Sequence, residues 1–149
     1  MTRPTVLITG ATGLIGRRVL SGLLRDNPKL HAFVLVRGPD GSKRIARLVE
    51  ADRGQITVIS GDVREAGLGL TTEHRQLLNE HKPAIVHLAA DTVFSRTIEV
   101  SRQTNLIGSE NLLDLSSQWD SRFCFVSTAF VAGRRTGKIL EINAGGGSG

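Results

Sequence analysis

Thr5-Val6-Leu7-Ile8-Thr9-Gly10-Ala11-Thr12-Gly13-Leu14-Ile15-Gly16 is the stretch of this chain that decides its fold. An apolar run that suits a buried strand leads directly into three glycines spaced three residues apart, and a helical pattern follows. The glycine spacing alone would be weak evidence. A glycine-rich turn between a strand and a helix, however, is the setting of a dinucleotide-binding site. The stretch therefore predicts a nucleotide cofactor.

The composition is that of one globular domain with a sizeable core: 149 residues, 40% hydrophobic and 22% charged. The N-terminus shows no signal-peptide pattern, and no apolar run approaches the ~20 residues of a membrane span. A single cysteine, Cys124, excludes an internal disulfide. Because it lies in the apolar run 123–126, we expect it in the core of a cytoplasmic protein.

The formal net charge is +5, with arginines paired at 17–18 and 134–135. Nucleic-acid binding would favour interleaved aromatic residues that stack on bases, yet aromatic residues make up 4% of the chain and tyrosine is absent. We therefore expect a phosphate-rich cofactor rather than a nucleic-acid partner.

Apolar runs alternate with helical patterns along the chain. Because the runs are continuous rather than alternating, they indicate parallel strands covered on both faces. With right-handed crossovers, the prediction is an α/β, Rossmann-type doubly wound parallel sheet of about five strands in the order 3-2-1-4-5. The predicted strands are 5–9, 31–37, 56–60, 84–90 and 122–127, and the predicted helices are 13–25, 42–52, 71–82 and 97–118.

The first helix shows an apolar stripe that predicts its buried face. The stripe consists of Ile15, Val19, Leu20, Leu23 and Leu24. We expect residues 1–143 to form an incomplete NAD(P)-binding domain, without later strands or a substrate subdomain. Residues 144–149, which are rich in glycine, are expected to form a flexible end.

The three glycines have distinct expected roles. Gly10 permits the tight turn, Gly13 lets the backbone approach the pyrophosphate, and Gly16 lets the helix pack closely on the sheet. The pyrophosphate would then lie on the free N–H groups of the first helix.

The end of the second predicted strand indicates which nicotinamide cofactor binds. An acidic residue there favours NAD, and an arginine favours NADP. Arg37 stands at this position, and Arg17 is a second candidate contact, whereas Asp40 is displaced behind Pro39 in an expected turn. NADP is favoured over NAD, with a merely solvated Arg37 as the alternative.

Other polar residues follow the later strands. Asp62 either accepts from the adenine amino group or forms an Asx-turn. Ala89 and Ala90 are small enough for the adenosine to lie against the backbone. His87 is expected to be buried and hydrogen-bonded, and the spacing of the histidines supports no metal site.

The fifth predicted strand ends in two hydroxyl side chains, Ser127 and Thr128. They fall at the carboxyl edge of the sheet, where α/β folds bind ligands, so one is expected to hydrogen-bond a substrate carbonyl. A hydroxyl alone does not deliver a proton efficiently, and no partner group is evident downstream.

These motifs resemble the extended short-chain dehydrogenase/reductases, through residues 9–16, Gly61-Asp62-Val63, 87–90 and Asn105-Leu106-Ile107-Gly108-Ser109. Residues 35–37, 67–70, 126–133 and 137–141 are most similar to the branch of thioester reductases and fatty acyl-CoA reductases, the male sterility type. The resemblance covers almost the whole chain and implies NADPH-dependent reduction of an acyl thioester held on CoA or a carrier protein.

The resemblance also implies site residues. Thr128, with Ser127 beside it, matches the family's catalytic Ser/Thr, and Asn105 matches a supporting helix asparagine. The Tyr-x-x-x-Lys motif has no counterpart, since the chain contains no tyrosine, so we expect no turnover by this chain alone. The residues expected at the cofactor are Gly10, Thr12, Gly13, Leu14, Ile15, Gly16, Arg17, Arg37, Asp62, Val63, Ala89, Ala90 and Asn105.

Two other functions are compatible with the same scaffold. One is a nucleotide-sugar epimerase/dehydratase or hydroxysteroid dehydrogenase, against which Arg37 and the stretch 67–70 argue. The other is a cofactor-binding module without catalysis, which the absence of tyrosine favours in a complete chain and does not bear on in a truncated one.

Overall fold

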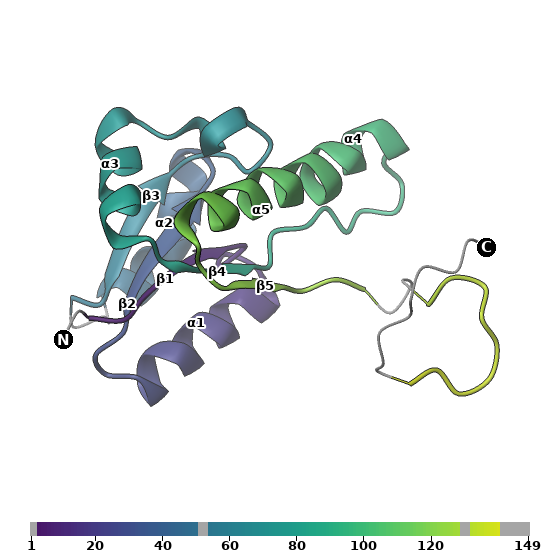
Figure 1. The fold of residues 1–149 in the computed structure, drawn as a ribbon, viewed down its shortest axis with the longest axis horizontal. Coiled ribbons are helices and arrows are strands. Elements are labelled where there is room, and N and C mark those ends of the chain that lie inside the picture. Colours follow the sequence, from purple (N-terminus) through teal and green to yellow (C-terminus); the bar gives the residue numbers. More distant parts are fainter. Residues whose placement is uncertain (1–2, 51–53, 129–131, 141–149) are drawn as a thin grey trace.

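The centre of the molecule is a five-stranded sheet in which all neighbouring strands are parallel. This is a computed structural model that describes residues 3–50, 54–128 and 132–140; the expected flexible end, 144–149, lies outside them. The strands are β1 (Thr5–Thr9), β2 (His31–Val36), β3 (Ile56–Ser60), β4 (Ala84–His87) and β5 (Phe123–Phe125). Their order, β3-β2-β1-β4-β5, confirms the predicted topology (Figure 1).

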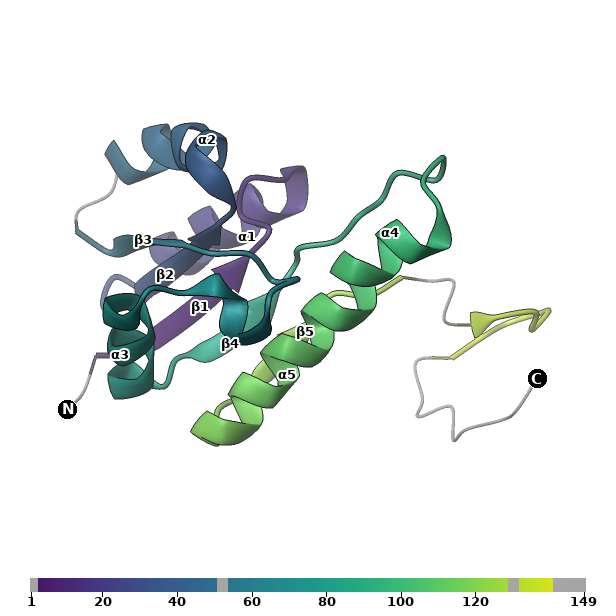
Figure 2. The same cartoon turned by 90° about the horizontal axis from the view of Figure 1, so that it is seen from above.

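The connecting helices are α1 (Leu14–Asp26), α2 (Gly38–Glu50), α3 (Thr72–His81), α4 (Ile98–Arg102) and α5 (Gly108–Trp119). A π-helical turn (Gln103–Ile107) joins α4 to α5, so the predicted helix 97–118 forms as one run with an irregular middle (Figure 2). Since α2 begins at Gly38, Asp40 lies in the first turn of a helix, and the predicted turn behind Pro39 is wrong. No helix among the described residues is long and apolar enough to cross a membrane.

Alternate residues of a strand point to opposite faces of the sheet. Both faces of this sheet carry apolar residues, and helices cover both. Figure 1 shows α1 and α5 on opposite sides of the strands. One core cluster joins the sheet to α1 and α2 and includes Val6, Ile8, Ala32, Val34, Leu20 and Ile45. The other joins it to α3 and α5 and includes Leu7, Phe33, Leu35, Leu78, Leu112 and Trp119. The continuous apolar runs therefore correctly predicted strands that are covered on both faces of the sheet.

The predicted apolar stripe of α1 is only partly buried. Val19, Leu20, Leu23 and Leu24 pack in the core, but Ile15 is 60% exposed. Ile15 lies in the first turn of the helix, beside the carboxyl edge of the sheet, whereas the later residues pack against the strands. Its assignment to the core is therefore corrected.

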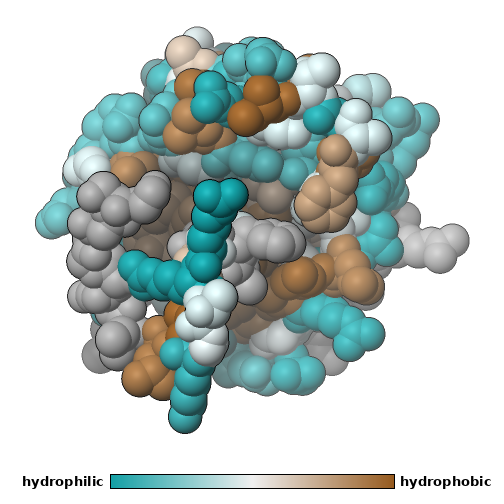
Figure 3. Space-filling view, turned by 90° about the vertical axis from the view of Figure 1, so that its right-hand side faces the viewer, coloured by the Kyte–Doolittle hydropathy of each residue, from teal (hydrophilic) through white to brown (hydrophobic). Residues whose placement is uncertain are grey.

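The strand β5 is more exposed than its sequence predicts. Phe125 is 46% exposed and Cys124 is also exposed, so the expected core position of Cys124 is wrong. The physical reason is position: within the described residues β5 pairs only with β4, at the edge of the sheet. Figure 3 looks onto the side of the molecule on which α4 lies in Figure 1 and shows apolar side chains at the surface between hydrophilic ones.

Candidate functional site

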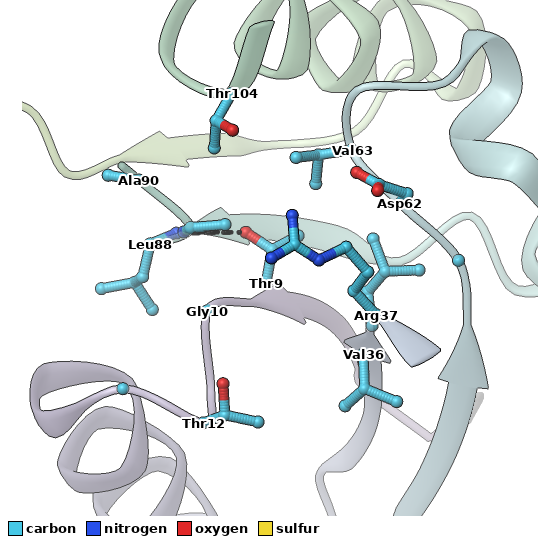
Figure 4. Close-up of a pocket in the computed structure, with 14 residues that line it drawn as sticks. Thr9, Gly10, Thr12, Val36, Arg37, Asp62, Val63, Leu88, Ala90 and Thr104 are labelled. Atoms are coloured by element: carbon cyan, nitrogen blue, oxygen red, sulfur yellow. Dashed lines mark hydrogen bonds between the residues drawn. The ribbon is translucent and has the colours of Figure 1, made fainter. Parts of the chain in front are cut away.

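A cavity of about 250 Å³ opens at the carboxyl ends of the parallel strands. The glycine-rich turn, the end of β2 and the loops after β3 and β4 form its wall (Figure 4). It brings together eight of the residues expected at the cofactor: Gly10, Thr12, Gly13, Arg37, Asp62, Val63, Ala89 and Ala90. Its wall also includes Thr9, Val36, Leu88 and Thr104, which the sequence reasoning did not assign to the cofactor.

The turn after β1 requires glycine for two different reasons. Gly10 has φ +72°, and a Cβ there would lie 2.5 Å from the Leu88 carbonyl carbon. A Cβ on Gly16 would overlap the Gly10 carbonyl oxygen. Gly13 is less crowded, since its nearest neighbour would be the Gly10 oxygen at 3.3 Å. The turn is thus packed tightly against β4 and α1, with Gly13 facing the cavity.

The N-terminus of α1 is open to an anion. Gly13 is its N-cap, no side chain caps it, and its first turn holds no acidic residue. The N-terminus of α3 differs, because Thr71 accepts from the His74 N–H and Glu73 lies in the first turn. The first N–H groups of α1, at Leu14, Ile15 and Gly16, carry the positive end of the helix dipole. This arrangement suits a pyrophosphate.

Three arginines stand around this opening. Arg37 is exposed and extends from the end of β2 into the cavity (Figure 4). Arg17 donates from Nε to the Thr12 carbonyl oxygen at 3.2 Å, and Arg44 donates to the same oxygen at 3.1 Å. The sequence reasoning missed Arg44, because it reaches the glycine-rich turn from α2, thirty-two residues away.

Asp62 lines the cavity and forms the Asx-turn that the sequence offered as the structural alternative. Its Oδ1 accepts from the Arg64 backbone N–H at 3.0 Å, and the Arg64 guanidinium donates to both carboxylate oxygens. Hydrogen bonds from Arg64 hold the pKa of the Asp62 carboxyl below its usual value, with a smaller Coulombic contribution from Arg37.

His87 is fully buried and hydrogen-bonded, as predicted, and its tautomer follows from its neighbours. Thr9 Oγ1 accepts from the N–H groups of Leu88 and Ala89, so its own hydrogen points to His87 Nδ1 at 2.7 Å. Nε2 then carries the proton and donates to Ser109 Oγ at 3.1 Å. Burial lowers the pKa of His87 to about 4, so the ring is neutral near pH 7.

This network continues to the other end of the site. Ser109 donates to the Asn105 carbonyl oxygen at 2.9 Å. The Asn105 side chain in turn accepts from the Asp91 N–H at 2.7 Å and donates to the Asp91 carbonyl oxygen at 2.9 Å. Asn105 therefore fixes the loop after β4 to the π-helical turn, and it lies outside the cavity beside the glycines.

A second cavity of about 340 Å³ adjoins the first and shares Ala89 and Ala90 with it. Asn105 and both predicted catalytic residues, Ser127 and Thr128, line it. Phe94, Phe125 and Val126 supply apolar wall. The candidate hydroxyls thus lie beside a space separate from the glycine-rich turn, on the same edge of the sheet. Nowhere in the described ranges do three His, Cys, Asp or Glu side chains gather as a metal site would require.

Comparison with known sequences identifies relatives. The family described as Male sterility protein matches residues 8–145. Fatty acyl-CoA reductase 1 of Gallus gallus is 33% identical over 144 residues, which is 85% of this chain and 28% of that protein. A polyketide synthase-nonribosomal peptide synthetase hybrid of Aspergillus japonicus is 33% identical over 129 residues, 86% of this chain and 3% of that protein.

Solved structures show the same likeness. The terminal R domain from the myxalamid PKS-NRPS biosynthetic pathway superposes with a TM-score of 0.77 at 30% identity, over 91% of this chain and 38% of that one. The reductase (R) domain of a nonribosomal peptide synthetase from Mycobacterium tuberculosis gives 0.72 at 26% identity, over 89% and 35%. The chain thus spans well under half the length of these relatives.

Proposed function

Because this chain belongs to the Male sterility protein family of NAD(P)-binding domains, we propose that it is the NADP(H)-binding part of a reductase that acts on acyl thioesters. The observation that carries the proposal is the cavity at the glycine-rich turn, where the open N-terminus of α1 and Arg37 converge. When bound, NADPH supplies the hydride. The chain's own residues would hold the pyrophosphate on α1 and the adenosine between Asp62, Val63, Ala89 and Ala90, which line the cavity.

The preference for NADP rests on the charge at the end of β2. Arg37 stands there and extends into the cavity, and Arg44 and Arg17 add two guanidinium groups at the rim. A 2′-phosphate would pair with these groups, whereas the 2′-hydroxyl of NAD lacks the charge to do so. Asp40, the nearest acid in sequence, is an exposed residue in the first turn of α2.

An affinity measurement on Arg37→Asp tests this assignment. Loss of a charge-assisted phosphate contact weakens the binding of NADPH by roughly 1.5–3 kcal/mol. The difference in affinity between NADPH and NADH should therefore narrow or reverse. Calorimetric titration of both cofactors gives the answer. A variant that keeps the full NADPH preference would show that Arg37 does not hold the phosphate.

The substrate class is proposed from the relatives, whose names denote a fatty acyl-CoA reductase and the reductase domain of a nonribosomal peptide synthetase. An acyl-CoA or carrier-bound acyl thioester would enter the second cavity, with its carbonyl oxygen near Thr128 or Ser127. A reductase of this kind also needs a proton donor of suitable pKa. This chain has no tyrosine, so we expect it to bind NADPH without oxidising it.

An absorbance assay of NADPH with a long-chain acyl-CoA tests the second part. We expect binding by calorimetry and no loss of NADPH absorbance above the rate without protein. Turnover that Thr128→Ala abolishes would overturn the expectation and assign the proton transfer to groups in this chain. Binding without turnover is also the behaviour of a non-catalytic cofactor-binding module.

A further inference from the structure

The pair formed by Asp62 and Arg64 is the most tightly bonded ion pair among the described residues. Arg64 Nη2 lies 2.6 Å from Asp62 Oδ2, and Nε lies 3.0 Å from each carboxylate oxygen. The Asp62 side chain is 11% exposed, and that of Arg64 is 42% exposed. A forked pair in which the carboxylate is nearly covered is held more firmly than a single contact between two exposed side chains.

The two members of the pair face different surroundings. Asp62 lines the cavity, and its carboxylate points into the same space as Arg37 (Figure 4). Arg64 is not among the residues that line the cavity, and its guanidinium is bonded to the Asp62 carboxylate. A phosphate beside Arg37 would therefore meet the Asp62 carboxylate before it met Arg64.

The electrostatic consequence concerns the charge of this corner. Without Arg64, the negative charge of Asp62 would cancel the positive charge of Arg37. A dianionic phosphate would then gain little electrostatic attraction at this corner. With Arg64 bonded to both oxygens, the carboxylate is neutralised and the corner keeps a net positive charge. Arg37 also helps to lower the pKa of the Asp62 carboxyl, although less than Arg64 does.

We propose that Arg64 is a specificity-determining residue that raises the preference for NADP(H) by neutralising Asp62, without contacting the phosphate itself. The inference rests on the proposed function, since it presupposes a 2′-phosphate beside Arg37. It concerns the cofactor's additional phosphate only. The affinity for NADH, which lacks that phosphate, is expected to depend little on Arg64.

A double-mutant cycle tests the proposal by calorimetric titration of NADPH and NADH. Arg64→Gln should weaken the binding of NADPH about three- to tenfold, a range expected for partly screened charges. It should change the affinity for NADH by less than about twofold. Arg64→Lys keeps the charge and should retain most of the preference. Asp62→Asn keeps the acceptor of the Asx-turn and removes the charge that Arg64 neutralises, so adding it to Arg64→Gln should restore the preference for NADPH over NADH.

A matched control is Arg25→Gln. Arg25 also pairs with a neighbouring aspartate, Asp26, at 2.8 Å, but at the far end of α1, about 18 Å along the helix from its N-terminus. It should leave both affinities unchanged. Urea unfolding of each variant verifies that the domain stays folded.

The contrary outcomes are distinct. Failure of Asp62→Asn to restore the NADPH preference of Arg64→Gln would mean that Arg64 touches the phosphate directly, and a loss of NADH affinity equal to that of NADPH would mean a purely structural role. Either result overturns the inference while leaving the NADP site in place. Equal affinities for the two cofactors in the unmutated protein would instead overturn the proposed NADP preference, and this inference with it.

Discussion

The strands β2 and β5 both consist mainly of apolar residues, yet they are buried to different extents. β2 lies between β1 and β3, and Ala32, Phe33 and Val34 are almost completely buried. β5 lies at the edge of the sheet, with Phe125 and Val126 nearly half exposed. An apolar run thus identifies a strand but does not determine how much of it is covered, which depends on its neighbours in the sheet.

The same contrast runs through the site. The glycine-rich turn beside β1 and β4 is closely packed, and the buried polar groups Thr9 and His87 there have partners. The hydroxyls of Ser127 and Thr128 follow β5, and both residues are exposed. The cofactor end of the site is therefore preformed, while the end that would meet a substrate is open.

Replacement of a phenylalanine in each strand should give the largest difference. Phe33→Ala empties a fully packed position and should lower the free energy of unfolding by about 3–5 kcal/mol. Phe125→Ala removes a half-exposed ring stacked on His87 and should lower it by less than about 1 kcal/mol. Urea unfolding of both variants measures the contrast. Similar losses would mean that β5 is as well covered as β2.

The packing of the glycine-rich turn can be tested at one atom. Gly16→Ala places a methyl group against the Gly10 carbonyl and should cost roughly 3 kcal/mol of unfolding free energy. Gly22→Ala, on the same helix, is the control. Its added Cβ would have no neighbour nearer than Arg25 Nη2 at 4.0 Å, so we expect a gain of up to about 1 kcal/mol. A harmless Gly16→Ala would contradict the close contact between α1 and the turn.

The buried histidine should make the domain acid-sensitive. The pKa of His87 is about 4 in the folded protein and about 6.5 when unfolded, so the unfolded state takes up the proton first as the pH falls. The contribution of neutral His87 to the free energy of unfolding is complete above pH 6.5 and is lost between pH 6.5 and 4. About 2 kcal/mol of it is lost by pH 5.

Urea unfolding at pH 7 and pH 5 measures this loss in the unmutated protein and in His87→Gln. The variant lacks the titrating ring, so its stability should fall less over the same interval. Identical pH dependence in the two proteins would assign the acid sensitivity to other groups.

The smallest effect on stability is expected at Cys124, which is exposed on β5. Its exposure is tested by the rate at which its thiol is labelled. A thiol reagent such as dithionitrobenzoate should label it in the folded protein, at a rate that sub-denaturing urea barely changes. Labelling that requires unfolding would show that Cys124 is in the core, as its apolar neighbours in the sequence suggested.

The sequence predicted most of the fold, because local patterns carry it. Continuous apolar runs located the strands, and the glycine-rich turn located the cavity where Gly10, Arg37 and Asp62 meet. The remaining features depend on contacts between distant segments. Arg44 reaches Thr12 across thirty-two residues, and the exposure of Ile15 follows from its place beside the sheet edge rather than from its apolar side chain.

The site shows the same limit. The pairing of Asp62 with Arg64 was open to prediction as an Asx-turn, but its forked geometry is a matter of side-chain placement. The chain from Thr9 through His87 to Ser109 joins three elements that no sequence spacing connects. The second cavity arises where the loop after β4, the π-helical turn and the end of β5 meet.

We propose that the cavity beside the glycine-rich turn binds NADP(H) in preference to NAD(H). Calorimetric titration of the unmutated protein with NADPH and with NADH tests it most directly. A charge-assisted phosphate contact predicts NADPH to bind about 10- to 150-fold more tightly. Equal affinities, or no binding of either cofactor, would contradict it.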